Sequence, residues 1–148
     1  MPPRIVNKKA RFDFEILETI EAGIELKGTE VKSVRAGKVS LVDSFARIRN
    51  GEIYLYGADI SPYMNAGYSH HDPRRPRRLL IHSREIHRLA GKVTQKGLTL
   101  VPTKMYFRRG WVKVELGLAR GKQKYDKRDA IKRREQQREI KRALTQRG

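Results

Sequence analysis

The sequence contains no cysteine, which excludes disulfide bonds and thiolate metal sites and leaves the redox compartment open. It has no apolar run near the roughly 20 residues that a membrane-spanning helix needs. Met1-Pro2-Pro3-Arg4 leads straight into a polar stretch, unlike a signal peptide. Acidic residues are also scarce, with 16 Asp and Glu against 34 Lys and Arg and a net charge of +18. We therefore expect a cytoplasmic protein with no membrane partner that binds an anionic polymer, most often a nucleic acid.

Signals of catalysis or cofactor binding are few. The four histidines offer no ligand spacing for a metal, and there is no P-loop, nucleophile elbow or dinucleotide fingerprint. His70 and His71 fall in an expected exposed loop, where solvation or phosphate contact is favoured over metal binding. Three carboxylates on a predicted hairpin, Asp43, Glu52 and Asp59, keep a magnesium-dependent nuclease open as an alternative. We expect no enzyme, no cofactor and no metal.

Several stretches of the first 120 residues have the patterns of β-strands. Apolar and polar residues alternate over residues 12–27, which predicts a strand with one buried face, and Gly23 is a candidate for a bend or bulge. Asn50-Gly51 suits a type I′ turn and predicts a hairpin joining residues 41–49 to 52–60. Further strands are expected at residues 98–107, with Pro102 marking an edge or a bulge, and at 111–118.

Two short helices are expected among these strands. Thr29 is a candidate N-cap for residues 30–36, and Ser83 for a helix whose Ile86 and Leu89 share one apolar face. Residues 61–78 are too rich in proline and charge for an interior element and predict a long connection. About six short strands with two small helices predict a mainly β fold, a compact antiparallel barrel over residues 1–120.

The last stretch, residues 121–148, has eleven Lys and Arg against four acids. Its residues are good helix formers, but its apolar side chains are too few to form a wide buried stripe. Such a helix has little to pack against and is marginal in free solution. We predict a flexible basic C-terminal tail that is disordered alone and becomes helical on a polyanion.

Basic and aromatic residues indicate how RNA binding would work. Cations in residues 7–11, 32–38 and 74–78 could contact phosphates. Aromatic side chains could stack on unpaired bases, although Tyr54, Tyr56 and Tyr106 lie inside predicted strands and are favoured as core residues. Tyr125 lies among cations outside any predicted core, so stacking on RNA is favoured there.

Four segments together resemble the small protein B family, the SsrA-binding proteins of bacterial trans-translation. They are GTEVKSVRAGK at residues 28–38, NKKAR at 7–11, RRLL at 77–80, and ARGK at 119–122 with DKR at 126–128. Their order follows that of the family, and the resemblance covers essentially the whole chain. Thr29 departs from the pattern, because relatives often have a bulky aromatic residue at this position.

The resemblance implies a fold, a function and partners. The fold would be a closed, six-stranded, oligonucleotide-binding-like (OB-like) barrel, and the protein a monomer that binds the tRNA-like domain of transfer-messenger RNA. With elongation factor Tu and GTP carrying the alanylated RNA, it would bring that RNA to stalled ribosomes. There the nascent peptide is tagged and the ribosome freed. The tail would sense the vacant decoding site and mRNA channel of the small subunit.

The resemblance also implies which residues act. Those that would bind transfer-messenger RNA are Asn7, Lys8, Arg11, Glu21, Gly23, Gly28, Glu30, Lys32, Arg35, Gly37, Lys38 and Leu80. Those of the ribosome-engaging tail are Gly121, Lys122, Lys124, Tyr125, Asp126, Lys127, Arg128, Lys132 and Arg133.

The two glutamates in the RNA-binding set are unexpected, because carboxylates repel phosphate. Glu21 and Glu30 could accept hydrogen bonds from base amino groups or 2′-hydroxyls, or they could simply pair with neighbouring lysines. A structural ribosomal-type protein is a second alternative to the whole interpretation, since it would also be small, basic and tailed.

Overall fold

The computed structural model describes residues 3–62 and 71–122. It has nine strands and three helices in this part of the chain. In chain order these are β1 (Ile5–Val6), α1 (Lys8–Asp13), β2 (Phe14–Ile24), α2 (Gly28–Arg35), β3 (Val39–Ser40), β4 (Phe45–Arg49), β5 (Glu52–Tyr56), β6 (Asp59–Ile60), β7 (Arg77–Leu80), α3 (Ser83–Lys96), β8 (Thr99–Arg108) and β9 (Trp111–Gly121). The predicted class, mainly β with small helices, is confirmed, although the described residues contain one helix more than expected.

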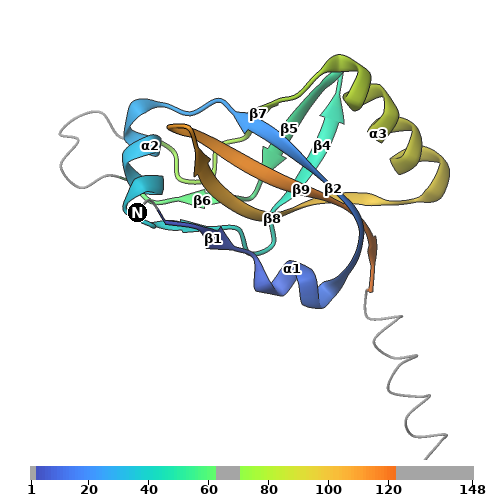
Figure 1. The fold of residues 1–148 in the computed structure, drawn as a ribbon, viewed down its shortest axis with the longest axis horizontal. Helices are drawn as coiled ribbons and strands as arrows, with labels where there is room; N and C mark the ends of the chain where they lie inside the picture. The colour runs from blue at the N-terminus through green and yellow to red at the C-terminus, as the bar shows by residue number, and fades with distance from the viewer. Residues whose placement is uncertain (1–2, 63–70, 123–148) are drawn as a thin grey trace, which may run out of the picture.

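Antiparallel pairing links six of the strands into a ring. The order runs β8, β4, β5, β7, β2, β9 and back to β8, with β1 added at β8, and β3 pairs with β6 in a separate ribbon. The pairing of β4 with β8 rests on one residue pair, Ala46 with Leu100. In Figure 1, α2 and α3 lie at opposite ends of the molecule, and α1 lies along a third edge.

The alternation predicted for residues 12–27 is confirmed within β2, where Ala22 and Ile24 are buried and Glu21 is exposed. It fails at Phe12, which lies in α1 with 69% of its surface exposed. The register shift of β2 falls between Ile16 and Glu18, so the bulge expected at Gly23 is instead near Leu17. The sequence did not predict α1 because this helix has only six residues. Its N-cap Asn7 also donates to the Leu41 carbonyl, 34 residues away, a contact that no local pattern reveals.

The turn predictions hold where glycine or proline fixes the backbone. Asn50 and Gly51 have φ values of 52° and 78°, as a type I′ hairpin requires. The β8–β9 pairing shifts register between Pro102 and Lys104, which confirms the bulge. Arg77 is the exception in the long connection, because it begins β7 and is fully buried.

Both predicted helices exist, but neither expected cap is the real one. The N-cap of α2 is Lys27 rather than Thr29, and the N-cap of α3 is His82 rather than Ser83. The carboxylate of Glu30 accepts the Lys27 N–H at 2.8 Å, which satisfies one of the free donors at the start of α2. Ile86 and Leu89 of α3 are buried in the main core, as predicted.

The end of the described chain belongs to the sheet. Gly121 pairs with Phe14, and the Lys122 N–H donates to the Asp13 carbonyl at 2.7 Å, so β9 extends one residue beyond the predicted boundary at 120. The rest of the predicted tail lies outside the described residues, and its disorder and folding stay predictions. None of the helices in residues 3–62 and 71–122 combines the length and apolar character needed to cross a membrane.

Candidate nucleic-acid interface

A buried ion pair holds α2 against the segment that leads into β7. The side chains of Glu30 and Arg77 are both fully buried, and Arg77 Nη2 lies 2.6 Å from Glu30 Oε2. Arg77 also donates to the carbonyls of Ala58 and Pro73, at 2.9 Å each. The pair therefore joins a helix to a strand that begins 47 residues later in the chain.

Glu30 has more donors around it than Arg77 alone. Arg75 Nε donates to its Oε2 at 3.1 Å, and the Lys27 N–H donates to its Oε1. Burial raises the pKa of Glu30, but the hydrogen bonds from Arg75, Lys27 and Arg77 outweigh burial and hold that pKa below its usual value. The carboxylate is thus ionised, buried and surrounded by donors of its own chain.

This arrangement corrects both hypotheses for Glu30. A fully buried carboxylate does not reach RNA bases or 2′-hydroxyls, and its partners are two arginines distant in sequence rather than neighbouring lysines. Glu30 acts on the surface indirectly, by fixing the position of α2.

His71 is also buried, which makes the expectation of a solvated or phosphate-contacting side chain wrong. It is 4% exposed, with Nδ1 3.0 Å from Thr29 Oγ1 and Nε2 2.8 Å from the Ile60 carbonyl. Because a carbonyl only accepts hydrogen bonds, Nε2 is the donor to Ile60, and Nδ1 is left to pair with the Thr29 hydroxyl. His70 lies outside the described residues.

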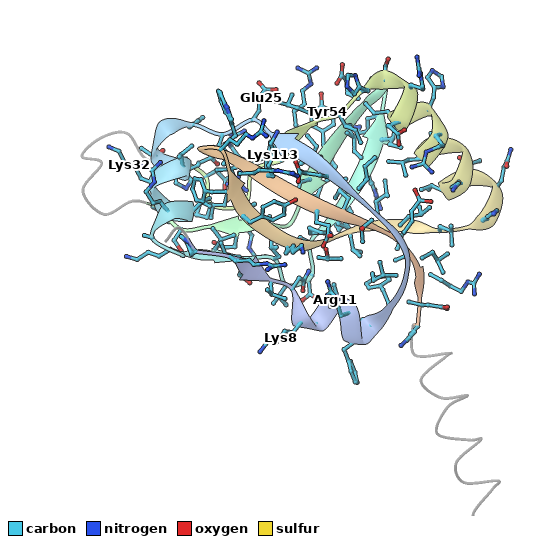
Figure 2. The ribbon with its side chains drawn as sticks, in the orientation of Figure 1. Lys8, Arg11, Glu25, Lys32, Tyr54 and Lys113 are labelled. Carbon is cyan, nitrogen blue, oxygen red and sulfur yellow. The ribbon has the colours of Figure 1, made fainter. Side chains whose placement is uncertain are left out.

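Exposed cations lie on α2 and just after its end. Lys32, Arg35 and Lys38 are all exposed, and the Arg35 guanidinium lies 5.6 Å from the centre of the Phe107 ring on β8. Figure 2 shows Lys32 at this end of the molecule. Gly37 ends the segment with a φ of 75°, a left-handed conformation that favours glycine and turns the chain toward β3.

Beside α2 lies an open groove of about 380 Å³, formed where β2, β7 and the β8–β9 turn meet. Gly23 and Leu80 pair across its floor, and a Cβ added to Gly23 would lie only 3.2 Å from that of Leu80. Leu80 is 45% exposed and Trp111 is 72% exposed. Lys113 lines the same groove, so apolar surface and positive charge lie together.

Glu21, two residues before Gly23 on β2, lines a separate open pocket with Tyr106 and Arg108 and, unlike Glu30, is partly exposed. Its Oε2 accepts from the Tyr106 hydroxyl at 2.6 Å and from Arg108 Nη1 at 2.8 Å. The Tyr106 hydrogen bond and the Arg108 charge hold the pKa of Glu21 below its usual value, against the effect of burial. Burial and Glu21 raise the pKa of Tyr106 to about 12. Glu21 therefore positions Tyr106 and Arg108 while 32% of its side chain remains exposed.

Sequence comparison places the chain in a family. The model of the family described as "SmpB protein" matches residues 4–146. The chain belongs to the SmpB protein family.

Two proteins similar to this SmpB-family chain carry the same name. The "SsrA-binding protein" of Synechococcus elongatus is 61% identical over 139 residues, covering 93% of this chain and 90% of the relative. That of Gloeothece citriformis is 60% identical with the same coverage. A chain in a solved structure, "tmRNA-SmpB: a journey to the center of the bacterial ribosome", is 61% identical and superposes with a TM-score of 0.69 over 82% of this chain and 85% of its own length.

The structure divides the expected SmpB-family RNA-binding residues between two places. One group lies on or beside α2 and the groove, namely Glu21, Gly23, Gly28, Glu30, Lys32, Arg35, Gly37, Lys38 and Leu80. The other group, Asn7, Lys8 and Arg11, lies at α1. Figure 2 shows Lys8 and Arg11 along a different edge from Lys32 and Lys113. Sequence resemblance alone could not show this separation.

Asn7 is a structural residue of the SmpB-family fold in this chain. Only 3% of it is exposed, and its Nδ2 donates to the carbonyls of Leu41 and Pro102 at 2.9 Å each. Its Oδ1 accepts the Ala10 N–H at 3.1 Å, which caps α1. Asn7 therefore ties α1 to β8 and does not offer its side-chain amide to a ligand.

Some residues of this region were absent from the RNA-binding set that the resemblance implied. Arg75 and Arg77 belong to residues 74–78, which were expected to contact phosphate, but both hold Glu30, and for the fully buried Arg77 that expectation is wrong. The others are Tyr106, Arg108, Trp111 and Lys113, which line the surface beside α2 and the groove. The one tryptophan, directly after a glycine turn, was a signal of an exposed aromatic. The buried role of Arg77 had no local signal.

The predicted tail residues and the three carboxylates fall in different parts of the chain. Gly121 and Lys122 are at the end of β9, whereas Lys124, Tyr125, Asp126, Lys127, Arg128, Lys132 and Arg133 lie outside the described residues. The three carboxylates considered for a nuclease pair with separate cations: Asp43 with Lys9, Glu52 with Arg78 and Asp59 with Arg74. Within residues 3–62 and 71–122, no group of three or more metal-ligating side chains gathers.

Proposed function

We propose that this chain binds the tRNA-like domain of transfer-messenger RNA and delivers it to stalled ribosomes for trans-translation. The observation that carries the proposal is the juxtaposition, in a chain 61% identical to a named SsrA-binding protein, of exposed cations on α2 with an open apolar groove. Rescue of the ribosome and tagging of the nascent peptide would follow from that delivery. The chain acts in this scheme as a binding protein, without catalytic chemistry of its own.

The two parts of the surface suit different features of a folded RNA. Lys32, Arg35 and Lys38 can each neutralise a phosphate, with the counterion release that makes such binding depend on salt. Leu80 and Trp111 present apolar surface on which unpaired bases of an RNA loop can pack. The absence of a side chain at Gly23 lets RNA approach the sheet closely.

The α1 group has a separate role in the proposal. Lys8 is exposed, and Arg11 lies 4.0 Å from the half-buried Glu115 while 57% of its side chain is exposed. These two cations lie on the side of the molecule where β9 ends. They are suited to contact a second stretch of RNA, and Asn7 holds the helix that carries them in place.

The finer architecture of the proposal is a closed OB-like barrel over residues 1–120 with a tail over residues 121–148. The six-stranded ring of pairings supports a barrel. The tail, disordered alone, would fold as a helix in a vacant mRNA channel, where its charge meets rRNA phosphates. A message in the channel would collide with it, so vacancy itself would be the signal.

The remaining partners follow from the RNA. Elongation factor Tu with GTP would meet the protein indirectly, through alanylated transfer-messenger RNA. The chain would act as a monomer in the cytoplasm.

Sequencing the RNA that co-purifies with the protein tests the proposal. Transfer-messenger RNA should be strongly enriched over its share of cellular RNA, and a Leu80→Asp variant should lose that enrichment while Arg84→Gln, on α3, retains it. Stoichiometric rRNA from all ribosomes, without enrichment of transfer-messenger RNA, would instead identify a structural ribosomal-type protein.

A further inference from the structure

The outer face of β4 and β5 carries a set of aromatic rings and arginines. None of them belongs to the RNA-binding residues that the resemblance implied. We propose that this face stacks unpaired bases of a single RNA strand, as a site continuous with the groove at Leu80. This stacking site would add a contact to the proposed function. The inference rests on the proposed function only for the identity of the RNA that is bound.

The hairpin register places the rings side by side. Phe45 lies opposite Tyr56, and Arg47 lies opposite Tyr54. The Phe45 and Tyr56 rings stack with centroids 5.6 Å apart and planes at 16°, and the Tyr54 ring lies 6.5 Å from that of Tyr56. The alternate residue Leu55 is fully buried, so it fills the core and the rings do not.

This placement overturns the expectation that Tyr54 and Tyr56 are core residues. Both are half-buried on the solvent side of β5. Their side chains leave ring surface available, which is the property that a stacking platform needs.

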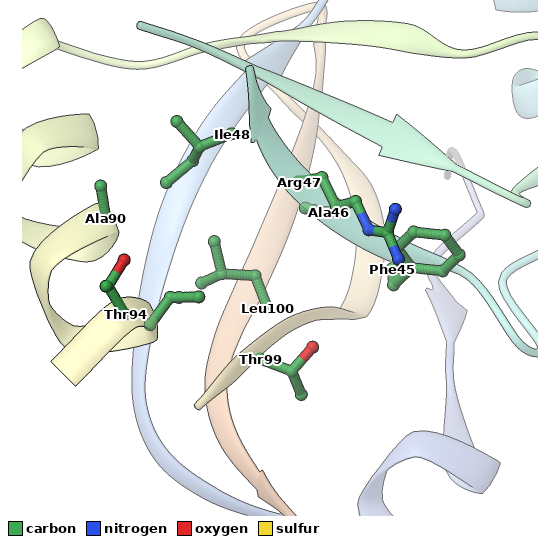
Figure 3. Close-up of a pocket in the computed structure, with 9 residues that line it drawn as sticks. Phe45, Ala46, Arg47, Ile48, Ala90, Thr94, Thr99 and Leu100 are labelled. Carbon is green, nitrogen blue, oxygen red and sulfur yellow. The ribbon is translucent and has the colours of Figure 1, made fainter. Parts of the chain in front are cut away.

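The cations on this face are directed at the rings. The Arg47 guanidinium lies 5.1 Å from the centre of the Phe45 ring, as Figure 3 shows, and Arg49 Nη1 donates to the Tyr56 hydroxyl at 3.3 Å. In the described part of the chain, neither Arg47 nor Arg49 forms a salt bridge with a carboxylate. Their charges therefore remain to attract phosphate, and a guanidinium plane can itself stack on a base.

The face joins the groove through β7. Arg78 lies opposite Tyr54, and Leu80 follows on the same side of β7 two residues later. Arg78 also pairs with Glu52 at 2.9 Å and with Glu25 at 3.4 Å, so its charge is shared between two carboxylates and offsets one of their two negative charges. In Figure 2, Tyr54, Glu25 and Lys113 lie along the same region of the molecule.

The other end of the face opens into a pocket. Phe45, Arg47 and Ile48 line a space of about 510 Å³ with Ala90 of α3 and Leu100 of β8, where β4 and β8 share one residue pair (Figure 3). A strand of RNA crossing from Leu80 to Phe45 would thus meet rings, cations and then a recess. A protein partner would be expected to meet more apolar and less charged surface at the centre of its interface.

The alternative is that the rings only stabilise the hairpin, as cross-strand aromatic pairs do. The two possibilities differ in whether binding needs bases. The probe is a short single-stranded oligouridine, compared with an abasic strand of the same length and the same number of phosphates. Affinities are measured at fixed salt on the full chain, with Tyr54→Leu, Arg47→Gln and the matched charge control Arg84→Gln.

We expect the wild-type chain to bind the oligouridine at least about fivefold more tightly than the abasic strand, since stacking contributes about 1 to 3 kcal/mol per base. Tyr54→Leu should reduce this preference, and Arg47→Gln should weaken binding to both strands more than Arg84→Gln does. Equal affinity of the wild-type chain for the two strands would overturn the inference. This comparison does not depend on the folding of any variant.

The same assay with the tRNA-like domain separates this inference from the proposed function. A chain that prefers oligouridine but does not bind the tRNA-like domain would retain the stacking site and lose the proposed function. A chain that binds the domain but shows no preference for bases would support the proposed function and contradict the stacking site.

Discussion

At the scale of single residues, Glu30 shows how a buried charge can position the proposed RNA-binding surface without being part of it. Removing a carboxylate and a guanidinium from water is costly, and the cost is offset here by hydrogen bonds from Arg77, Arg75 and Lys27. Such a pair adds little stability compared with apolar residues, but removing one member leaves the other charge buried without its counter-ion. The pair therefore fixes one position of α2.

The variant Glu30→Gln tests this role. It keeps the size of the side chain and removes its charge, so we expect the free energy of unfolding to fall by about 3 to 5 kcal/mol. Urea denaturation measures the change. The matched control is Glu25→Gln, whose exposed carboxylate lies 3.4 Å from Arg78, and it should cost under about 1 kcal/mol. Equal losses of unfolding free energy in the two variants would show that the buried ion pair contributes no more to stability than the exposed one.

At the scale of elements, α2 presents cations because its inner side is committed to the core. Val34 is fully buried, and the buried Ser33 hydroxyl donates to the Ser61 carbonyl at 2.6 Å, so the helix has one orientation available. That orientation leaves Arg35 exposed beside Phe107, and Lys38 is exposed just after the helix.

The double variant Arg35→Gln with Lys38→Gln should weaken binding to the tRNA-like domain and flatten its salt dependence. Each lost phosphate contact lowers the slope of log affinity against log salt by about 0.7 to 0.9. Binding titrations at several salt concentrations give the slope. Arg84→Gln, at the opposite end of the molecule on α3, should leave it unchanged. An unchanged slope in the double variant would remove α2 from the interface.

The attachment of α3 to β2 gives a prediction about pH. Glu18 accepts from Arg88 and Lys92, and these hydrogen bonds lower its pKa to about 2 from an ordinary 4.5. Because the folded pKa is depressed, the stabilisation is complete above pH 4.5 and is lost as pH falls toward 2. The difference in unfolding free energy between wild type and Glu18→Gln should shrink across this window in urea titrations. A difference that does not vary with pH would contradict the assignment.

At the scale of the whole molecule, the predictable features were local and the missed ones were not. The alternation in β2, the Asn50-Gly51 turn and the apolar face of α3 each depend on residues that are close together in the sequence. Glu30 and Arg77 are 47 positions apart, and nothing near either one predicts that both are buried.

The candidate site follows the same rule. The family motifs pointed to α2, Gly23 and Leu80, which the structure brings to one surface, but Trp111 and Lys113 join them only through the pairing of β9 with β2. Asn7 belongs to a motif yet is buried, since a motif records that a residue matters and not whether it faces a partner.

The proposed function divides the molecule into a folded part that binds RNA and a basic tail of residues 121–148. The surface on α2 and the groove is built from residues 3–62 and 71–122, so we expect it to bind RNA without the tail. Tagging on stalled ribosomes, by contrast, should need the cations of residues 125–148.

Deleting residues 125–148 and measuring both activities of the same preparation tests this division most directly. We expect the dissociation constant for the tRNA-like domain of transfer-messenger RNA to stay within about threefold of the full chain's, a difference of under about 1 kcal/mol. Peptide tagging on stalled ribosomes should fall to background. A deletion that weakens RNA binding as much as it weakens tagging would contradict the separation of the folded part from the tail.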